Sequence, residues 1–164
     1  TYTLEKNIPY LGICFGFQLA AVAFGRKMCN LENANSTEII ADTNNPIIDL
    51  LPEQKNETDM GGSLRLGANE IKIDQNSLAY KIYNSDKIFK RHRHRYEFNT
   101  KYRDEFLKKG MIFSGESDDG KRMEILEIPS HKFFLGVQFH PEFNSRPGFP
   151  EDVFKTFVTT ASSK

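Results

Sequence analysis

The stretch PYLGICFGFQLA, residues 9–20, changes its hydrophobic pattern within five residues. Tyr10 to Ile13 form a short apolar run, which predicts a buried strand. From Phe15 to Lys27 the apolar residues recur at roughly helical spacing, which predicts a helix. Cys14 lies at the junction, inside the pattern Gly-Ile-Cys-Phe-Gly. A chain that passes directly from a buried strand into a helix favours an α/β fold.

Two interpretations of Cys14 follow from this position. A residue at such a tight turn often has strained backbone, and a flanking glycine lets neighbouring chain approach closely. The nucleophile elbow of hydrolases has the same strand-turn-helix layout. A helix N-terminus behind the sulfur lowers the pKa of a thiol, so Cys14 is a candidate nucleophile. The alternative is a packed strand-helix junction with an inert, buried thiol.

Length and charge limit the class of protein. A chain of 164 residues is predicted to form one domain over 1–164, and its 22 basic and 22 acidic residues cancel. This balance favours neither nucleic acid nor a membrane surface as partner. No apolar run approaches the ~20 residues of a membrane span, and the N-terminus lacks the pattern of a signal peptide. Two cysteines are too few for a disulfide scaffold, so we expect a reduced, cytoplasmic compartment, with Cys29 as a packing residue.

The remaining chain alternates between strand and helix patterns, as expected for a sheet covered by helices. The strand that precedes Cys14 begins so early that we expect its flanking strands, and hence a longer parent protein, to lie outside this sequence. Residues 41–62 are polar and broken by proline and glycine, which predicts a loop. Strands are predicted within 63–73, 91–98, 110–117, 122–128 and 132–139, and helices within 76–83, 100–110 and 151–161.

A cysteine nucleophile needs a base close in space. The four candidates are His92, His94, His131 and His140. His140 ends the most apolar strand, in GVQFHPEF, where the following proline stops the strand and Glu142 can turn back toward the imidazole. The carboxyl end of a strand is where α/β sheets place their chemistry. Taken alone, His-Pro-Glu is more typical of a strand-end turn with a solvated carboxylate; the balance reverses when it occurs together with Gly-x-Cys-x-Gly in one short α/β chain.

The run RHRHRYE, residues 91–97, is the most basic part of the chain. Strand alternation sends Arg91, Arg93 and Arg95 to one face, and His92, His94 and Tyr96 to the other. The run is therefore compatible with an exposed strand face, a phosphate-binding patch or a site for one carboxylate.

The motifs GICFG and FHPE together resemble the class I glutamine amidotransferases. That resemblance implies a flavodoxin-like α/β fold, with a mostly parallel central sheet flanked by helices, and a Cys-His-Glu triad. Within the class, the blocks PYLGICFGFQLA, ENANSTE, GGSLRLG, RHRHRYE and GVQFHPEFNSRP resemble the CTP synthase group. These blocks extend from Ile8 to Pro147.

The resemblance implies catalytic roles for three side chains and one backbone group. Cys14 would attack the side-chain amide of glutamine and form a glutamyl thioester. His140 would transfer the protons, and Glu142 would orient His140. The backbone N–H of Phe15 would donate to the oxyanion.

The resemblance also implies a substrate site, in which Gln18 lines the pocket, Glu38 faces the substrate ammonium, and Arg95 faces the carboxylate with Tyr96 beside it. The charges agree with this, because free glutamine is a zwitterion that needs one acid and one guanidinium. Phe15 and Phe17 stand where the family often has Leu and Met, so we expect an altered pocket shape.

The implied partners lie beyond this domain. The domain itself would need no cofactor or metal. A synthase domain, absent from this sequence, would bind ATP, Mg and UTP and use the ammonia, with GTP as an allosteric activator and a homotetramer as the complete enzyme. The second oxyanion donor of the family comes from an upstream glycine-rich loop that this sequence does not contain. Two rivals remain: a γ-glutamyl hydrolase or another class I amidotransferase, and a regulatory module that has lost activity.

Overall fold

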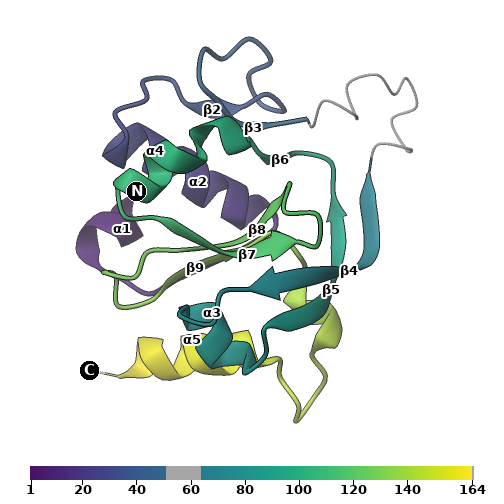
Figure 1. Ribbon diagram of the computed structural model, residues 1–164. Helices are drawn as coiled ribbons and strands as arrows, with labels where there is room; N and C mark the ends of the chain where they lie inside the picture. The colour runs from purple at the N-terminus through teal and green to yellow at the C-terminus, as the bar shows by residue number, and fades with distance from the viewer. Residues whose placement is uncertain (51–63, 164) are drawn as a thin grey trace.

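The computed structural model describes residues 1–50 and 64–163. Part of the predicted 41–62 loop therefore lies outside the described residues. Figure 1 shows the elements in order: α1 (Tyr2–Lys6), β1 (Tyr10–Ile13), α2 (Phe15–Met28), β2 (Asn35–Ser36), β3 (Pro46–Asp49), β4 (Arg65–Ile73), α3 (Leu78–Tyr83), β5 (Lys87–His94), β6 (Glu97–Phe98), η1 (Thr100–Tyr102), α4 (Arg103–Lys108), β7 (Ile112–Ser117), β8 (Met123–Glu127), β9 (Phe134–Val137), η2 (Pro141–Asn144) and α5 (Asp152–Ser162).

The strand order of the large sheet is β1-β9-β8-β7-β4-β5. β1 pairs with β9 in parallel, whereas the other neighbouring pairs of this sheet, within the described residues, are antiparallel. The expectation of a mostly parallel sheet is therefore wrong for this part of the chain. The reason is the short connections: β7 and β8 are joined by residues 118–122, with Gly120 at φ 70°. A parallel connection needs a dozen or more residues, so such a turn can only reverse the chain.

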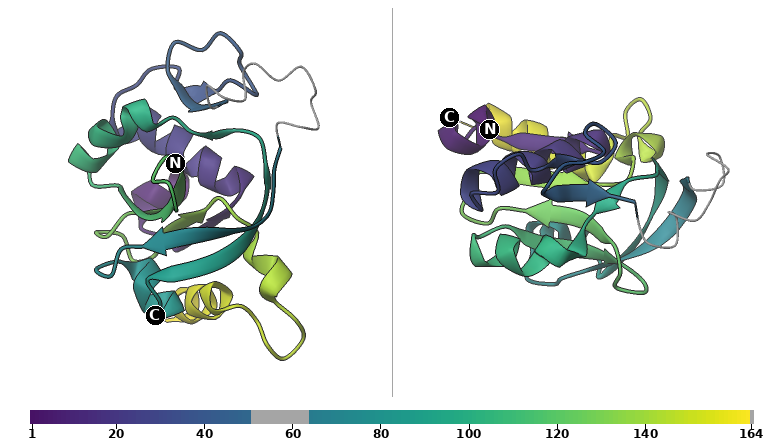
Figure 2. Two further views of the ribbon diagram at one scale, coloured as in Figure 1. Left: turned by 45° about the vertical axis from the view of Figure 1, so that its right-hand side comes forward. Right: turned by 90° about the horizontal axis from the view of Figure 1, so that it is seen from above.

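Two hydrophobic cores lie on opposite faces of this sheet (Figures 1 and 2). One core contains residues of α2, α4 and the small sheet β2-β3-β6, and the other contains residues of α3 and α5. Successive strand residues point to opposite faces, so Leu126 joins the first core and Ile125 the second. The nearly continuous apolar pattern of β8 and β9 follows from burial on both faces.

The predicted helices are present, with ends within a few residues of the expected positions. α2 covers the predicted helix after Cys14, and the Ser77 and Glu151 side chains cap α3 and α5 by accepting from backbone N–H groups. β3 lies within residues 41–62, which are predicted as a loop, and β2 lies just before that stretch. Within the described residues, no helix combines the length and the apolar character that crossing a bilayer requires.

Candidate active site

The turn between β1 and α2 has the strained geometry expected of an elbow. Cys14 has φ 48° and ψ −100°, a conformation that residues with a Cβ rarely adopt. Its backbone N–H donates to the carbonyl of Val137 at 2.8 Å, which ties the turn to β9. A Cβ on Gly12 would lie 2.7 Å from the backbone carbonyl carbon of Gly16, so only glycine fits there. The strained turn and the close approach at a flanking glycine are both confirmed.

The thiol of Cys14 has two polar neighbours. Its Sγ lies 3.9 Å from the carbonyl oxygen of Arg93, and the Gln138 amide nitrogen donates to Sγ at 3.8 Å. Burial raises the pKa of the Cys14 thiol, whereas the backbone N–H of Phe15 lowers it. The net direction is upward, so the predicted lowering is wrong for the protein without substrate: the helix N-terminus acts as expected, but desolvation outweighs it.

His140 lies at the same sheet edge as the thiol. β1 and β9 run parallel with Ile13 beside Val137, so Cys14 and His140 both follow the carboxyl ends of neighbouring strands. The Glu142 Oε1 atom is 2.6 Å from the Nδ1 atom of His140. Nδ1–H therefore donates to the carboxylate, which leaves Nε2 as the basic nitrogen. Nε2 is buried and has no hydrogen-bond partner among the described residues.

A cavity of about 520 Å³ opens beside Cys14. The five predicted substrate-binding residues all line it: Phe15, Gln18, Glu38, Arg95 and Tyr96. They come from three places in the fold, namely α2, the turn after β2 and the segment after β5. The cavity thus holds a carboxylate and a guanidinium near the Cys14 thiol, an arrangement that suits a zwitterionic ligand. Ile39, Leu64, Arg93 and His94 complete the lining.

Two details of the pocket differ from expectation. Phe15 is 46% exposed and lines the cavity, whereas Phe17 is fully buried in the core beside α2, so only Phe15 shapes the site. Sequence reasoning missed Gln138, a fully buried residue next to the thiol. The sequence does contain a signal for it, because Gln138 interrupts an otherwise apolar stretch. A buried amide needs hydrogen-bond partners, so a glutamine at such a position indicates polar neighbours.

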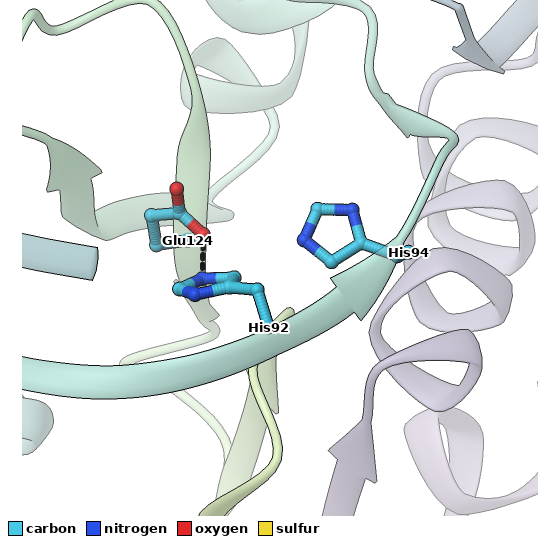
Figure 3. A group of neighbouring side chains, drawn as sticks. All are labelled: His92, His94 and Glu124. Atoms are coloured by element: carbon cyan, nitrogen blue, oxygen red, sulfur yellow. Dashed lines mark hydrogen bonds and ion pairs between the residues drawn. The ribbon is translucent and has the colours of Figure 1, made fainter. Parts of the chain in front are cut away.

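A buried polar cluster formed by His92, His94 and Glu124 lies on the side of β5 opposite its exposed arginines (Figure 3). Their potential ligand atoms lie within 4.8 Å of one another, so these three could in principle hold a metal ion. Both nitrogens of His92 are already engaged, Nε2 with Glu124 at 2.9 Å and Nδ1 with the Lys90 carbonyl at 3.0 Å. Arg65 also pairs with Glu124. This geometry is that of an ion-pair network, in which a cation would compete with Arg65.

The burial pattern of β5 confirms the predicted alternation from Arg91 to His94, since Arg91 and Arg93 are exposed and His92 and His94 are buried. The prediction is wrong for Arg95 and Tyr96, because β5 ends at His94 and both of these residues are half-buried and line the cavity. Burial and the charge of His92 lower the pKa of His94 to about 3, so His94 lines the pocket as a neutral group.

Comparison with known proteins identifies relatives of this chain. The family model for "Glutamine amidotransferase class-I" matches residues 1–160. The CTP synthase of Staphylococcus haemolyticus is 52% identical over 160 residues, which cover 98% of this chain and 30% of the relative. The CTP synthase of Archaeoglobus fulgidus is 51% identical over 160 residues, with the same coverage. The chain thus spans about 30% of the length of these relatives.

A solved structure supports the same assignment. The glutaminase domain of Trypanosoma brucei CTPS, with bound acivicin, matches with a TM-score of 0.91 and 35% sequence identity. The match covers 99% of this chain and 63% of that chain. The fold class inferred from the sequence motifs is thereby confirmed, although the described sheet is mixed. The chain belongs to the class I glutamine amidotransferase family.

Proposed function

We propose that residues 1–164 form part of the glutaminase domain of a CTP synthase and hydrolyse L-glutamine to glutamate and ammonia. The observation that carries this proposal is the pocket, which gathers Cys14, Glu38 and Arg95 at the sheet edge where His140 follows β9. The relatives named CTP synthase support the choice of this group within the family.

In the first half-reaction, His140 Nε2 takes the proton of the Cys14 thiol, and Cys14 Sγ attacks the side-chain amide carbon of glutamine. The Phe15 backbone N–H donates to the oxyanion that forms. The C–N bond then breaks, and ammonia leaves with a proton from His140 Nε2. A glutamyl thioester on Cys14 remains.

In the second half-reaction, water attacks the thioester. His140 Nε2 takes a proton from this water, the C–S bond breaks to release glutamate, and the same proton returns to the sulfur of Cys14. Glu142 accepts a hydrogen bond from Nδ1–H throughout, with Oε1 2.6 Å from Nδ1, and stabilises the imidazolium. The sum is glutamine plus water giving glutamate plus ammonia.

Recognition of glutamine uses its two charged ends. Glu38 receives the α-ammonium and Arg95 the α-carboxylate, with Tyr96 beside it and Gln18 in the pocket wall. A guanidinium can form two parallel hydrogen bonds to a carboxylate, which fixes the orientation of the substrate. The reactive amide then points toward Cys14.

In this proposal, the ammonia is a substrate for another domain of the complete protein. A synthase domain outside this sequence would use ammonia, ATP and Mg to convert UTP to CTP, with GTP as activator, in a cytoplasmic homotetramer. The second oxyanion donor would come from the upstream part of the amidotransferase domain. Removal of one oxyanion donor costs roughly 100- to 1000-fold in rate, so the complete domain is the right object for assays.

Labelling with 6-diazo-5-oxo-L-norleucine, an electrophilic glutamine analogue, tests this proposal. In the full-length protein that carries this sequence, we expect an adduct on Cys14 at neutral pH and protection by glutamine. Cys29 is the internal control, because burial raises the pKa of its thiol to about 11. The Cys14→Ser variant controls for background labelling. Equal labelling of both cysteines, or no glutamine-protected adduct, would favour the inactive regulatory module instead.

A further inference from the structure

Gln138 connects the reactive sulfur to the substrate-binding wall. It follows β9 directly, is fully buried, and its backbone N–H donates to the Glu124 carbonyl at 2.8 Å. Its side-chain amide lies between Cys14 Sγ, at 3.8 Å, and the amide of Gln18, at 3.4 Å. A buried amide in this position has a restricted set of partners, so its orientation is determined by them.

The neighbouring hydrogen bonds fix which end of Gln138 faces the sulfur. Gln18 Nε2 donates to the Tyr96 backbone carbonyl at 2.9 Å, and a carbonyl can only accept. The second proton of that amide nitrogen then faces the oxygen of Gln138. Gln138 therefore turns its own N–H toward Cys14.

The two polar neighbours of Cys14 interact with different protonation states of its sulfur. A thiol can donate to the Arg93 carbonyl, whereas a thiolate can only accept. The Gln138 amide is a donor, and a donor bonds a charged acceptor about twice as strongly as a neutral one. Deprotonation of Cys14 therefore transfers its main polar contact from Arg93 to Gln138.

We propose that Gln138 is a positioning residue that stabilises the thiolate of Cys14, and that Gln18 orients it from the substrate-binding wall. This inference rests on the proposed role of Cys14 as nucleophile. It adds a link between substrate binding and the nucleophile, because Gln18 is bonded both to Gln138 and to the segment that carries Arg95 and Tyr96. A substrate that binds against this segment therefore also fixes, through Gln18, the orientation of the Gln138 N–H group at the sulfur.

The test is the pH dependence of Cys14 alkylation by iodoacetamide, a neutral reagent that needs no substrate site. Peptide mass spectrometry follows the rate in the full-length protein and in Gln138→Met, which keeps the side-chain length but removes the donor. Gln75→Met, at an exposed turn, is the matched control. The other charged or titratable groups around the thiol are unchanged in these variants: Glu38, Arg93, His94, Arg95 and Tyr96 of the cavity, Glu142, whose charge acts on the thiol, and His140, which follows the neighbouring strand.

In Gln138→Met we expect the alkylation rate at pH 7 to fall about tenfold while the limiting rate at high pH stays the same, since a lost donor shifts ionisation and not access. Gln18→Met, which does not touch the sulfur, should lower the rate at pH 7 about threefold. An unchanged pH profile, or a fall in the limiting rate alone, would overturn the proposal. If Gln138→Met does not fold, Gln18→Met decides by the same criterion. Failure of glutamine-analogue labelling with a shifted alkylation profile would refute the proposed function alone.

Discussion

Cys14 holds a backbone conformation that costs about 1–3 kcal/mol and persists only where its surroundings determine it. Two neighbours do so. The Val137 carbonyl accepts the Cys14 N–H, and the missing side chain of Gly12 lets the first turn of α2 lie against β1. Tyr10 completes this contact by donating from its hydroxyl to the Gly16 carbonyl at 2.8 Å. The reactive residue is thus positioned by backbone packing.

Gly12→Ala tests this packing against a matched glycine in the same motif. Its Cβ would overlap the backbone of Gly16, so we expect the free energy of unfolding to fall by about 1–3 kcal/mol. In Gly16→Ala the nearest atom to the new Cβ is the Tyr10 hydroxyl at 3.6 Å, an ordinary contact, and alanine favours a helix. That variant should be as stable as the parent or slightly more stable. Urea unfolding measures both, and equal losses would contradict the close-approach argument.

Arg95→Ala tests the assignment of the substrate carboxylate. A hydrogen bond to a charged partner contributes ~1.5–3 kcal/mol, so kcat/KM for glutamine should fall about 10- to 150-fold. Arg95→Lys should restore little, because an ammonium lacks the planar two-point contact. Arg91→Ala, on the preceding strand β5 but outside the cavity, is the control. Steady-state kinetics with glutamine and with ammonia measure these effects, and glutamine kinetics unchanged by Arg95→Ala would assign the basic run to another ligand.

Among the elements, β5 has two faces with different roles. Its exposed residues include Arg93 of the pocket, while its buried residues join an ion-pair network with β8 and the adjoining β6. In that network Glu124 accepts from His92 and Arg65, and Glu97 lies 3.3 Å from Arg122. Removing one partner of a buried pair is strongly destabilising, so the network holds the pocket segment on the sheet.

Glu97 makes the stability of the folded protein depend on pH. Burial and the charge of Glu124 raise the pKa of Glu97 to about 8, from 4.5. The unfolded chain therefore releases this proton near pH 4.5, whereas the folded protein keeps it to about pH 8. Stability from this group is lost as the pH rises through that window. Glu97→Gln has no proton to release, so its stability relative to the parent should increase steadily from pH 5 to pH 8.

Urea unfolding at several pH values measures this difference. Glu70→Gln, at a partly exposed ion pair with Lys87, controls for the loss of a surface charge. A difference between Glu97→Gln and the parent that is the same at pH 5 and pH 8 would show that Glu97 titrates alike in both states.

At the scale of the whole molecule, the parallel pairing of β1 with β9 places the first strand of the described chain beside the last one. The sequence could predict these two strands, because each is a short apolar run next to a breaker, and it could predict their shared edge from the carboxyl-end rule. The pocket residues were predictable from motifs, since their types match the charges of glutamine. The small sheet was not, because β2 and β6 are two residues long and depend on tertiary pairing. The buried network was missed because charged residues in strands normally face solvent.

The most direct test of the account compares two nitrogen donors in the full-length protein that carries this sequence. In Cys14→Ala, CTP formation with glutamine should fall about a thousandfold or more, because the proposed nucleophile is lost. CTP formation with added ammonia should stay near that of the parent, since in this proposal Cys14 acts only in releasing ammonia. A parallel loss of both activities in a folded protein, or glutamine-dependent CTP formation that survives the substitution, would contradict a Cys14-dependent glutaminase.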